Sequence, residues 1–141
     1  MTPRLRICVL LAAAAACPKA FADEVTLECS GQLSRYSSDF ATRLETIDPY
    51  TFTVSFDMST RRLLSGPVAD PRSFSLRENA DSVEFFRDTV VSGRKARELL
   101  SINRVSGVLV QQILLQDPAS GRPDAPTPLL SADCKRVTKL F

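Results

Sequence analysis

Alternation of apolar and polar side chains is the clearest pattern in this chain. From Tyr50 to Met58 every second residue is apolar, and the residues between are threonine, serine or aspartate. A period of two places one set on a buried face and the other on a wet face, so it predicts a β-strand in an antiparallel sheet. Similar patterns predict strands at Val25 to Leu33, around Leu63 and Leu64, and at Phe74 to Arg77, Ser82 to Arg87, Leu99 to Val105, Val108 to Leu115 and Leu129 to Val137.

Turn sequences separate several of these segments. Glu78 to Asp81 and the pair Ser106-Gly107 are typical of hairpin turns. Two segments do not alternate. Ser34 to Ile47 has apolar residues at near-helical spacing, and we predict a long loop with helical character there, with a short amphipathic helix as the alternative. Asp117 to Pro128 contains four prolines and one glycine, which predicts a stiff, exposed connection.

The number and spacing of the strands predict an all-β fold. Seven or eight short strands at hairpin-length spacing are typical of a β-barrel or a β-sandwich. We expect an antiparallel meander in one domain, because the chain shows no internal repeat and no interdomain linker.

The first 22 residues have the organisation of a secretory signal peptide. Arg4 and Arg6 precede an apolar run from Ile7 to Ala16, and the segment ends in Ala20-Phe21-Ala22. The run is shorter than the roughly 20 residues that span a bilayer. We therefore expect residues 23–141 to form one β-barrel domain in the periplasm or outside the cell, with no transmembrane segment. A degraded lipobox ending at Cys17 leaves lipid anchoring at that residue as an alternative.

Export makes a disulfide the expected state of the two remaining cysteines. Cys29 lies near the start of the mature chain and Cys134 near its end. Their bond would close a loop of about 100 residues, worth roughly 4–5 kcal/mol in the chain-entropy model. Bonded cysteines have Cα atoms within about 7 Å of each other. The first and last strands should therefore lie side by side, which favours a closed barrel over an open sheet.

The charge balance indicates no nucleic-acid partner. The whole chain has a net charge of +2. Removal of residues 1–22 takes away Arg4, Arg6 and Lys19, leaving 15 basic against 16 acidic side chains. A nearly neutral domain has no strong field to attract nucleic acid or an anionic membrane.

The side-chain inventory points away from an enzyme. The chain has no histidine, its acidic residues are scattered, and it has no glycine-rich phosphate loop. We predict no catalytic residue, no metal site and no cofactor. Ser92 and Lys95 match the S-x-x-K pattern of penicillin-recognising enzymes, but the companion motifs are absent. We interpret them as a loop serine beside a solvated lysine.

One basic segment is the candidate partner contact. It comprises Ser92, Gly93, Arg94, Lys95 and Arg97. Such a cluster can bind a phosphate, an acidic polysaccharide or an acidic groove of a protein. The alternative is a charged loop that keeps a hairpin soluble.

Three local motifs resemble those of small exported proteobacterial proteins of unknown function. They are Cys29-Ser30-Gly31, the hairpin from Ile102 to Leu109, and the stretch from Cys134 to Phe141. The resemblance supports the expected fold and export, and it carries no information about activity. Ser92-Gly93 also resembles part of the Ser-Gly-x-x-Tyr motif of periplasmic inhibitors of c-type lysozymes, with Ala96 in place of the tyrosine.

These observations predict a non-catalytic periplasmic or secreted binding or interaction module. Its ligand is not identified by the sequence, and a periplasmic or extracellular protein or a glycan is the candidate partner. Two alternatives stay open. The protein inhibits a cell-wall hydrolase through the segment from Ser92 to Arg97, or it carries a small apolar ligand inside the barrel.

Overall fold

A computed structural model describes residues 24–137 as a single antiparallel sheet of eight strands. The expected signal peptide and the Cys17 anchor lie outside the described residues. The elements are β1 (Glu24–Tyr36), β2 (Arg43–Asp57), β3 (Arg62–Ser65), a 3-10 turn η1 (Pro71–Ser73), β4 (Ser75–Glu78), β5 (Ser82–Val91), β6 (Arg94–Asn103), β7 (Val108–Leu115) and β8 (Thr127–Arg136).

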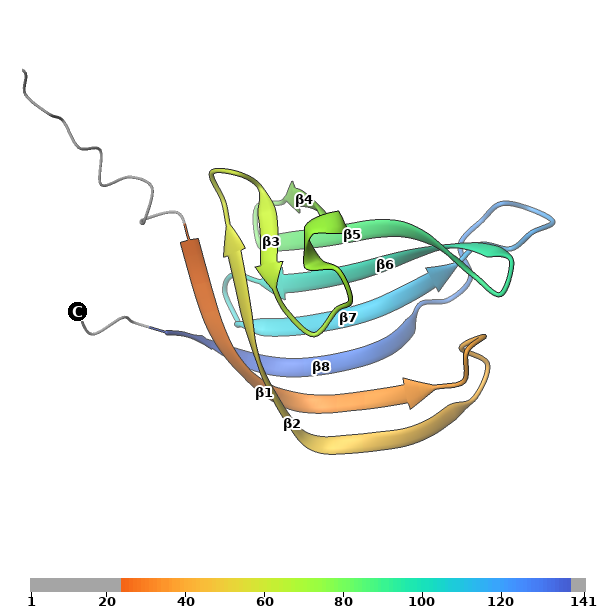
Figure 1. The fold of residues 1–141 in the computed structure, drawn as a ribbon, viewed down its shortest axis with the longest axis horizontal. Helices are drawn as coiled ribbons and strands as arrows, with labels where there is room; N and C mark the ends of the chain where they lie inside the picture. Colours follow the sequence, from red (N-terminus) through yellow and green to blue (C-terminus); the bar gives the residue numbers. More distant parts are fainter. Residues whose placement is uncertain (1–23, 138–141) are drawn as a thin grey trace, which may run out of the picture.

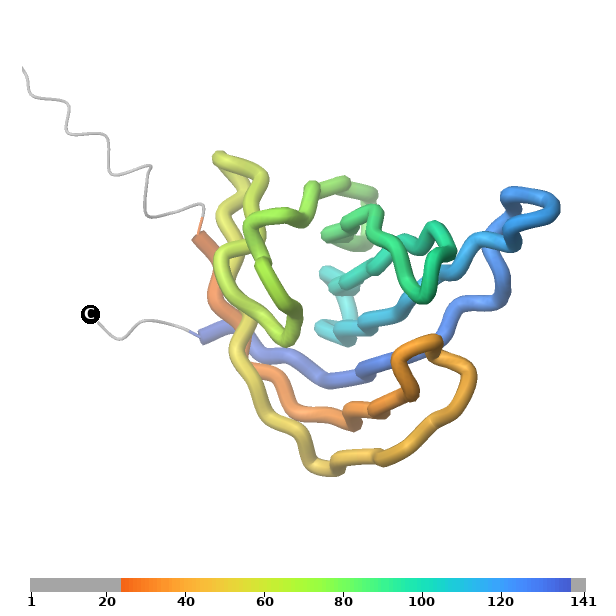
Figure 2. The backbone as a smooth tube through the Cα atoms, turned by 45° about the vertical axis from the view of Figure 1, so that its right-hand side comes forward, coloured from red at the N-terminus to blue at the C-terminus, as the bar shows by residue number. Residues whose placement is uncertain are grey.

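The sheet curls into a nearly closed barrel. Its strand order is β3-β2-β1-β8-β7-β6-β5-β4, so the first and last strands of the chain pair in the middle of the sheet. Figures 1 and 2 show the strands wrapped around a common centre, with the start of β1 and the end of β8 side by side. Among the described residues, β3 and β4 are the two edge strands and do not pair with each other; between them, Arg61 Nη2 donates a hydrogen bond to the Leu76 carbonyl at 3.0 Å. The predicted all-β barrel is confirmed.

The disulfide joins β1 and β8 as the cysteine positions predicted. Cys29 and Cys134 are direct partners in the β1–β8 register, with Cα atoms 4.1 Å apart and a sequence separation of 105. The bond therefore staples the two strands that bring the two ends of the chain together.

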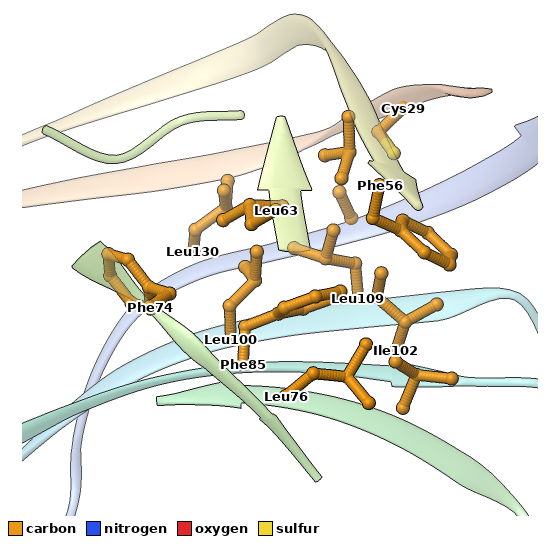
Figure 3. Close-up of a cluster of buried hydrophobic side chains, with 13 residues drawn as sticks. Cys29, Phe56, Leu63, Phe74, Leu76, Phe85, Leu100, Ile102, Leu109 and Leu130 are labelled. Atoms are coloured by element: carbon orange, nitrogen blue, oxygen red, sulfur yellow. The ribbon is translucent and has the colours of Figure 1, made fainter. Parts of the chain in front are cut away.

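Inward-facing side chains of every strand form one core. In β2 the alternation continues as predicted, with Val54 and Phe56 buried and Thr53 exposed. Phe85 on β5 is 0% exposed, and its ring centroid lies 5.3 Å from that of Phe56. Figure 3 shows this cluster, with Phe56 and Ile102 toward one side and Phe74 toward the other.

The prediction of a loop with helical character at Ser34 to Ile47 was wrong. This segment is the end of β1, a turn, and the start of β2. Leu33 and Ile47 face each other across the hairpin. The Asp39 carboxylate accepts hydrogen bonds from Ser37 Oγ and the Ala41 N–H, which lowers the pKa of Asp39. The apolar spacing resembled a helix by accident, and pairing with β1 decides the structure.

Gly31 allows β1 and β8 to approach closely. A Cβ atom at this position would overlap the Ser131 carbonyl and the Ala132 side chain. The β1–β2 ladder also shifts register beside Gly31, and Figure 1 shows β1 and β2 strongly bent. A glycine at this position thus lets the two long strands follow the curvature of the barrel.

Candidate functional site

A hollow of about 510 Å³ opens at one end of the barrel. We call this end the mouth; β1 begins there, β8 ends there, and the β6–β7 turn lies beside them (Figure 1). The β1–β2, β5–β6 and β7–β8 connections lie at the opposite end, which we call the far end. The apolar lining of the hollow includes Val25, Leu27, Phe56, Met58, Val83 and Ile102.

The lining residues occupy the inward phase of their strands, that is, the alternate positions whose side chains face the barrel interior. Val25 and Leu27 continue the face that carries Cys29, and Ile102 continues the face that carries Leu100. Four strands and the Met58 turn therefore present apolar side chains to the same space. Inward-facing apolar side chains fill the centre of the barrel, whereas at this end they line an open hollow.

The β6–β7 turn is a rigid wall of the hollow. The Asn103 side-chain oxygen accepts hydrogen bonds from the N–H groups of Val105 and Ser106, each at 2.9 Å. Gly107 has φ +75°, and a Cβ atom there would lie 2.7 Å from the Cys134 carbonyl oxygen. The Cys134 N–H donates to the Gly107 carbonyl at 3.0 Å. These bonds tie the turn to β8.

Two arginines stand on the rim of the hollow. Arg136 is in the inward phase of β8, two residues after Cys134, and lies directly opposite Leu27 on β1. Arg104 follows β6 and donates from Nη2 to the Glu78 carboxylate. This hydrogen bond and the Arg104 charge hold the pKa of Glu78 below its ordinary value, and the Arg61 charge adds to the effect. Within residues 24–137, no carboxylate forms an ion pair with Arg136.

A row of polar side chains occupies the interior toward the far end. Arg87 Nη2 donates to Glu98 at 2.6 Å, and Gln111 Nε2 donates to the other Glu98 oxygen at 2.9 Å. Arg87 also donates to the Ala69 carbonyl and to Ser73 Oγ. This interior polar row thus holds the β3–β4 connection against the open side of the barrel.

Sequence reasoning did not identify the interior polar row. Glu98 lies between Ala96 and Leu100, and Gln111 lies between Leu109 and Ile113. Each occupies the inward position of its strand, and Gln111 is only 5% exposed. The sequence signal that locates this row is a polar residue at a strand position whose neighbours two residues away are apolar.

The structure places Ser92 and Gly93 of the predicted contact segment in the β5–β6 turn at the far end, and Arg94, Lys95 and Arg97 at the start of strand β6 rather than in a loop. Ser92 and Gly93 both have positive φ, as a tight hairpin turn requires. Arg94 donates to the Gln116 carbonyl and to Asp124 at 2.6 Å. Lys95 is exposed and has no ion-pair partner among the described residues.

Arg97 is the fifth residue of that segment, and it is bound on its own sheet. It donates to both oxygens of Asp88, at 2.7 and 3.2 Å, and lies over the Phe86 ring with 5.0 Å from Cζ to the centroid. The hydrogen bond from Arg97 lowers the pKa of Asp88. The five residues are close together, but both arginines already have carboxylate partners.

Potential catalytic and metal-binding groups are dispersed. Both cysteines of the described range form the disulfide. Residues 24–137 hold no group of three Cys, Asp or Glu side chains arranged for a metal ion. Glu84 binds Arg77, and no hydrogen bond joins Ser92 to Lys95 within this range.

Comparison with known protein families, with characterised proteins and with solved structures finds no match for this chain. In the part of the chain that the structure describes, no helix has the length and hydropathy needed to cross a membrane. The site must therefore be interpreted from its own chemistry.

Proposed function

We propose that this protein is a non-catalytic binding module that holds a small, largely apolar ligand in the hollow at the barrel mouth. The observation that carries the proposal is the hollow itself. Its volume of about 510 Å³ lies in the range of ligand sites, roughly 300–1,000 Å³. Its apolar lining and few polar rim groups also fit such a site, and the mouths of β-barrels commonly hold ligands.

The location we propose is the periplasm or the outside of the cell. The disulfide is compatible with an oxidising compartment, and the arrangement of charge and apolar residues in 1–22 supports export. The disulfide can offset part of the core packing that an open hollow lacks.

The mouth is a better candidate than the β5–β6 turn. Arg94 and Arg97 already bind Asp124 and Asp88, so an anionic partner would have to displace an internal carboxylate from each. Only Lys95 offers an exposed cation there without such a competitor among the described residues. The inhibitor hypothesis therefore has less support than a ligand in the hollow.

Binding of a neutral fluorescent probe tests the proposal. N-phenyl-1-naphthylamine becomes bright in apolar surroundings, and we expect the protein to bind it. Leu27→Trp places an indole in the hollow and should weaken probe binding at least about tenfold, since part of the apolar site is filled. Leu64→Trp is the matched control, because Leu64 is exposed on β3 and does not line the hollow.

Circular dichroism establishes that both variants are folded, and Met58→Trp replaces Leu27→Trp if the latter does not fold. Absence of probe binding by the unaltered protein would reject the proposal. Equal binding by the filled and control variants would reject it as well.

A further inference from the structure

We infer that the ligand of the hollow is a single-chain amphipath whose anionic carboxylate head lies at the rim, against Arg136 and Arg104. This inference rests on the proposed function, since it concerns the same hollow. It goes further by assigning the chemical class of the ligand and the orientation in which it binds.

Arg136 carries the strongest part of the argument. It lies on the inward phase of β8, whose preceding positions on that face are Cys134, Ala132 and Leu130. A residue at the inward position next to the core is normally apolar, as Leu27 is on the opposite strand. An arginine there can cover the apolar wall with its methylene groups and present its guanidinium at the rim. That guanidinium can bind a carboxylate through two parallel hydrogen bonds.

Arg104 adds a second cation on the same rim. It is held in place by Glu78, which also experiences the Arg61 charge. Glu78 is ion-paired with Arg104 alone among the described residues. With Arg136, the rim therefore has two arginines and one inward-facing carboxylate.

The other carboxylates near the mouth do not offset this excess. Glu24 and Asp57 are paired in register on the outward phase of β1 and β2. Asp57 accepts hydrogen bonds from Ser59 and Thr60 within its own turn, and these lower the pKa of Asp57. Asp81 is exposed in the β4–β5 turn. The inward side of the mouth therefore has positively charged side chains at its rim and apolar side chains along its lining. This arrangement matches a ligand in which a carboxylate is joined to one hydrocarbon chain.

Competition with the fluorescent probe tests this assignment. Dodecanoate, dodecanol and dodecyltrimethylammonium share one chain and differ in the charge of the head. We expect dodecanoate to displace the probe at the lowest concentration and the ammonium compound at the highest, all below their aggregation concentrations. Raising the salt from about 0.05 M to about 0.5 M should weaken dodecanoate and leave dodecanol unchanged, because salt screens exposed charges.

Three variants sharpen the test. Arg136→Gln should weaken dodecanoate about tenfold, the loss of one charge-assisted interaction, and leave dodecanol unchanged. Glu78→Gln should tighten dodecanoate, because Arg104 then lacks its internal partner. Arg122→Gln is the matched control, since Arg122 lies in the β7–β8 connection at the far end.

The outcomes separate this inference from the proposed function. Equal affinity for the three dodecyl compounds, with Arg136→Gln unaffected, would overturn the carboxylate assignment and leave a site for neutral ligands. Binding to phosphatidylglycerol vesicles that dodecanoate does not compete with would overturn it in favour of a lipid surface. Failure of the unaltered protein to bind the probe or any dodecyl compound would overturn both.

Discussion

The two ends of the barrel interior differ in the side chains that face inward. Toward the far end, Arg87, Glu98 and Gln111 enter the interior, and each has an internal partner. At the mouth, the inward side chains are apolar and enclose a hollow, while Arg136 and Arg104 stand at the rim. One end is thus closed by charge pairing, and the other is left open with cations at its edge.

This difference depends on which side chains occupy the inward positions at each end. A buried charge is tolerated only with a partner of opposite charge and further hydrogen bonds. Glu98 is the anionic partner of Arg87, and the Ala69 carbonyl and Ser73 Oγ accept its further hydrogen bonds. The Arg87 Cζ also lies 4.7 Å from the Phe74 ring centroid. Within the described residues Arg87 Nε alone remains buried without a hydrogen-bond partner. The inward-facing polar groups toward the far end therefore bind one another, whereas those at the mouth surround an apolar hollow.

Removal of the disulfide is expected to have the largest effect, and to act more on the mouth than on the far end. The variant Cys29→Ser/Cys134→Ser should lose about 4 kcal/mol of unfolding free energy, because the bond closes a loop of roughly 100 residues. Urea denaturation measures this loss. An unchanged midpoint would contradict it.

Hydrogen exchange then locates the effect of the same variant. Cys134 lines the hollow, and the Val137 N–H donates to the Thr26 carbonyl beside it. Amides at this end of β1 and β8 should exchange faster, while those around Glu98 keep their protection. Uniform acceleration across the sheet would show that the two ends open together.

The second largest effect is expected from breaking the interior polar row. Glu98→Ala leaves the Arg87 guanidinium in the interior without its carboxylate, and we expect a loss of about 3 kcal/mol. The Glu98 side chain is only 13% exposed, so solvent compensates little. Glu45→Ala is the matched control, because its ion pair with Arg35 is exposed at both partners. That variant should lose less than about 1 kcal/mol. Similar losses in the two variants would contradict the role of burial.

At the centre of the barrel, the sequence predicted which side chains of a strand face the core, because burial of one face requires apolar and polar residues to alternate. The segment from Tyr50 to Met58 is the clearest case, and the pairing of Cys29 with Cys134 was predicted from the expectation of export and from the number of cysteines. Such features depend on local pattern or on simple counting, so no knowledge of strand register is needed.

The features that were missed depend on register. The Arg94–Asp124 and Arg97–Asp88 pairs join positions 30 and 9 residues apart, and only the strand pairing shows that they meet. The volume of the mouth depends on how far the strands splay, which alternation does not determine. The near-helical spacing in Ser34 to Ile47 misled for the same reason, because its pairing with β1 is not a local property.

Charge reversal at the β5–β6 turn is expected to have a small effect on stability and none on the hollow. Arg94→Glu/Lys95→Glu removes one exposed ion pair, so the loss should be within about 1 kcal/mol. Probe binding should be unchanged, because the turn lies at the far end.

A lysozyme assay of the unaltered protein and the same variant accompanies this measurement. Inhibition by the unaltered protein that disappears in the variant would transfer the functional site from the mouth to the turn.

Acidification is expected to have the most diffuse effect, because lowered pKa values occur at both ends. The hydrogen bond from Arg97 lowers the pKa of Asp88 at the far end, and that from Arg104 lowers the pKa of Glu78 at the mouth. A carboxylate with a lowered pKa in the folded state stabilises the fold above its unfolded pKa. That contribution is lost as the pH falls through the folded value. The melting temperature should therefore decline from the ordinary values of 3.8 and 4.5 downward. Asp88→Asn should flatten part of this decline; a curve equal to that of the unaltered protein would contradict the assignment.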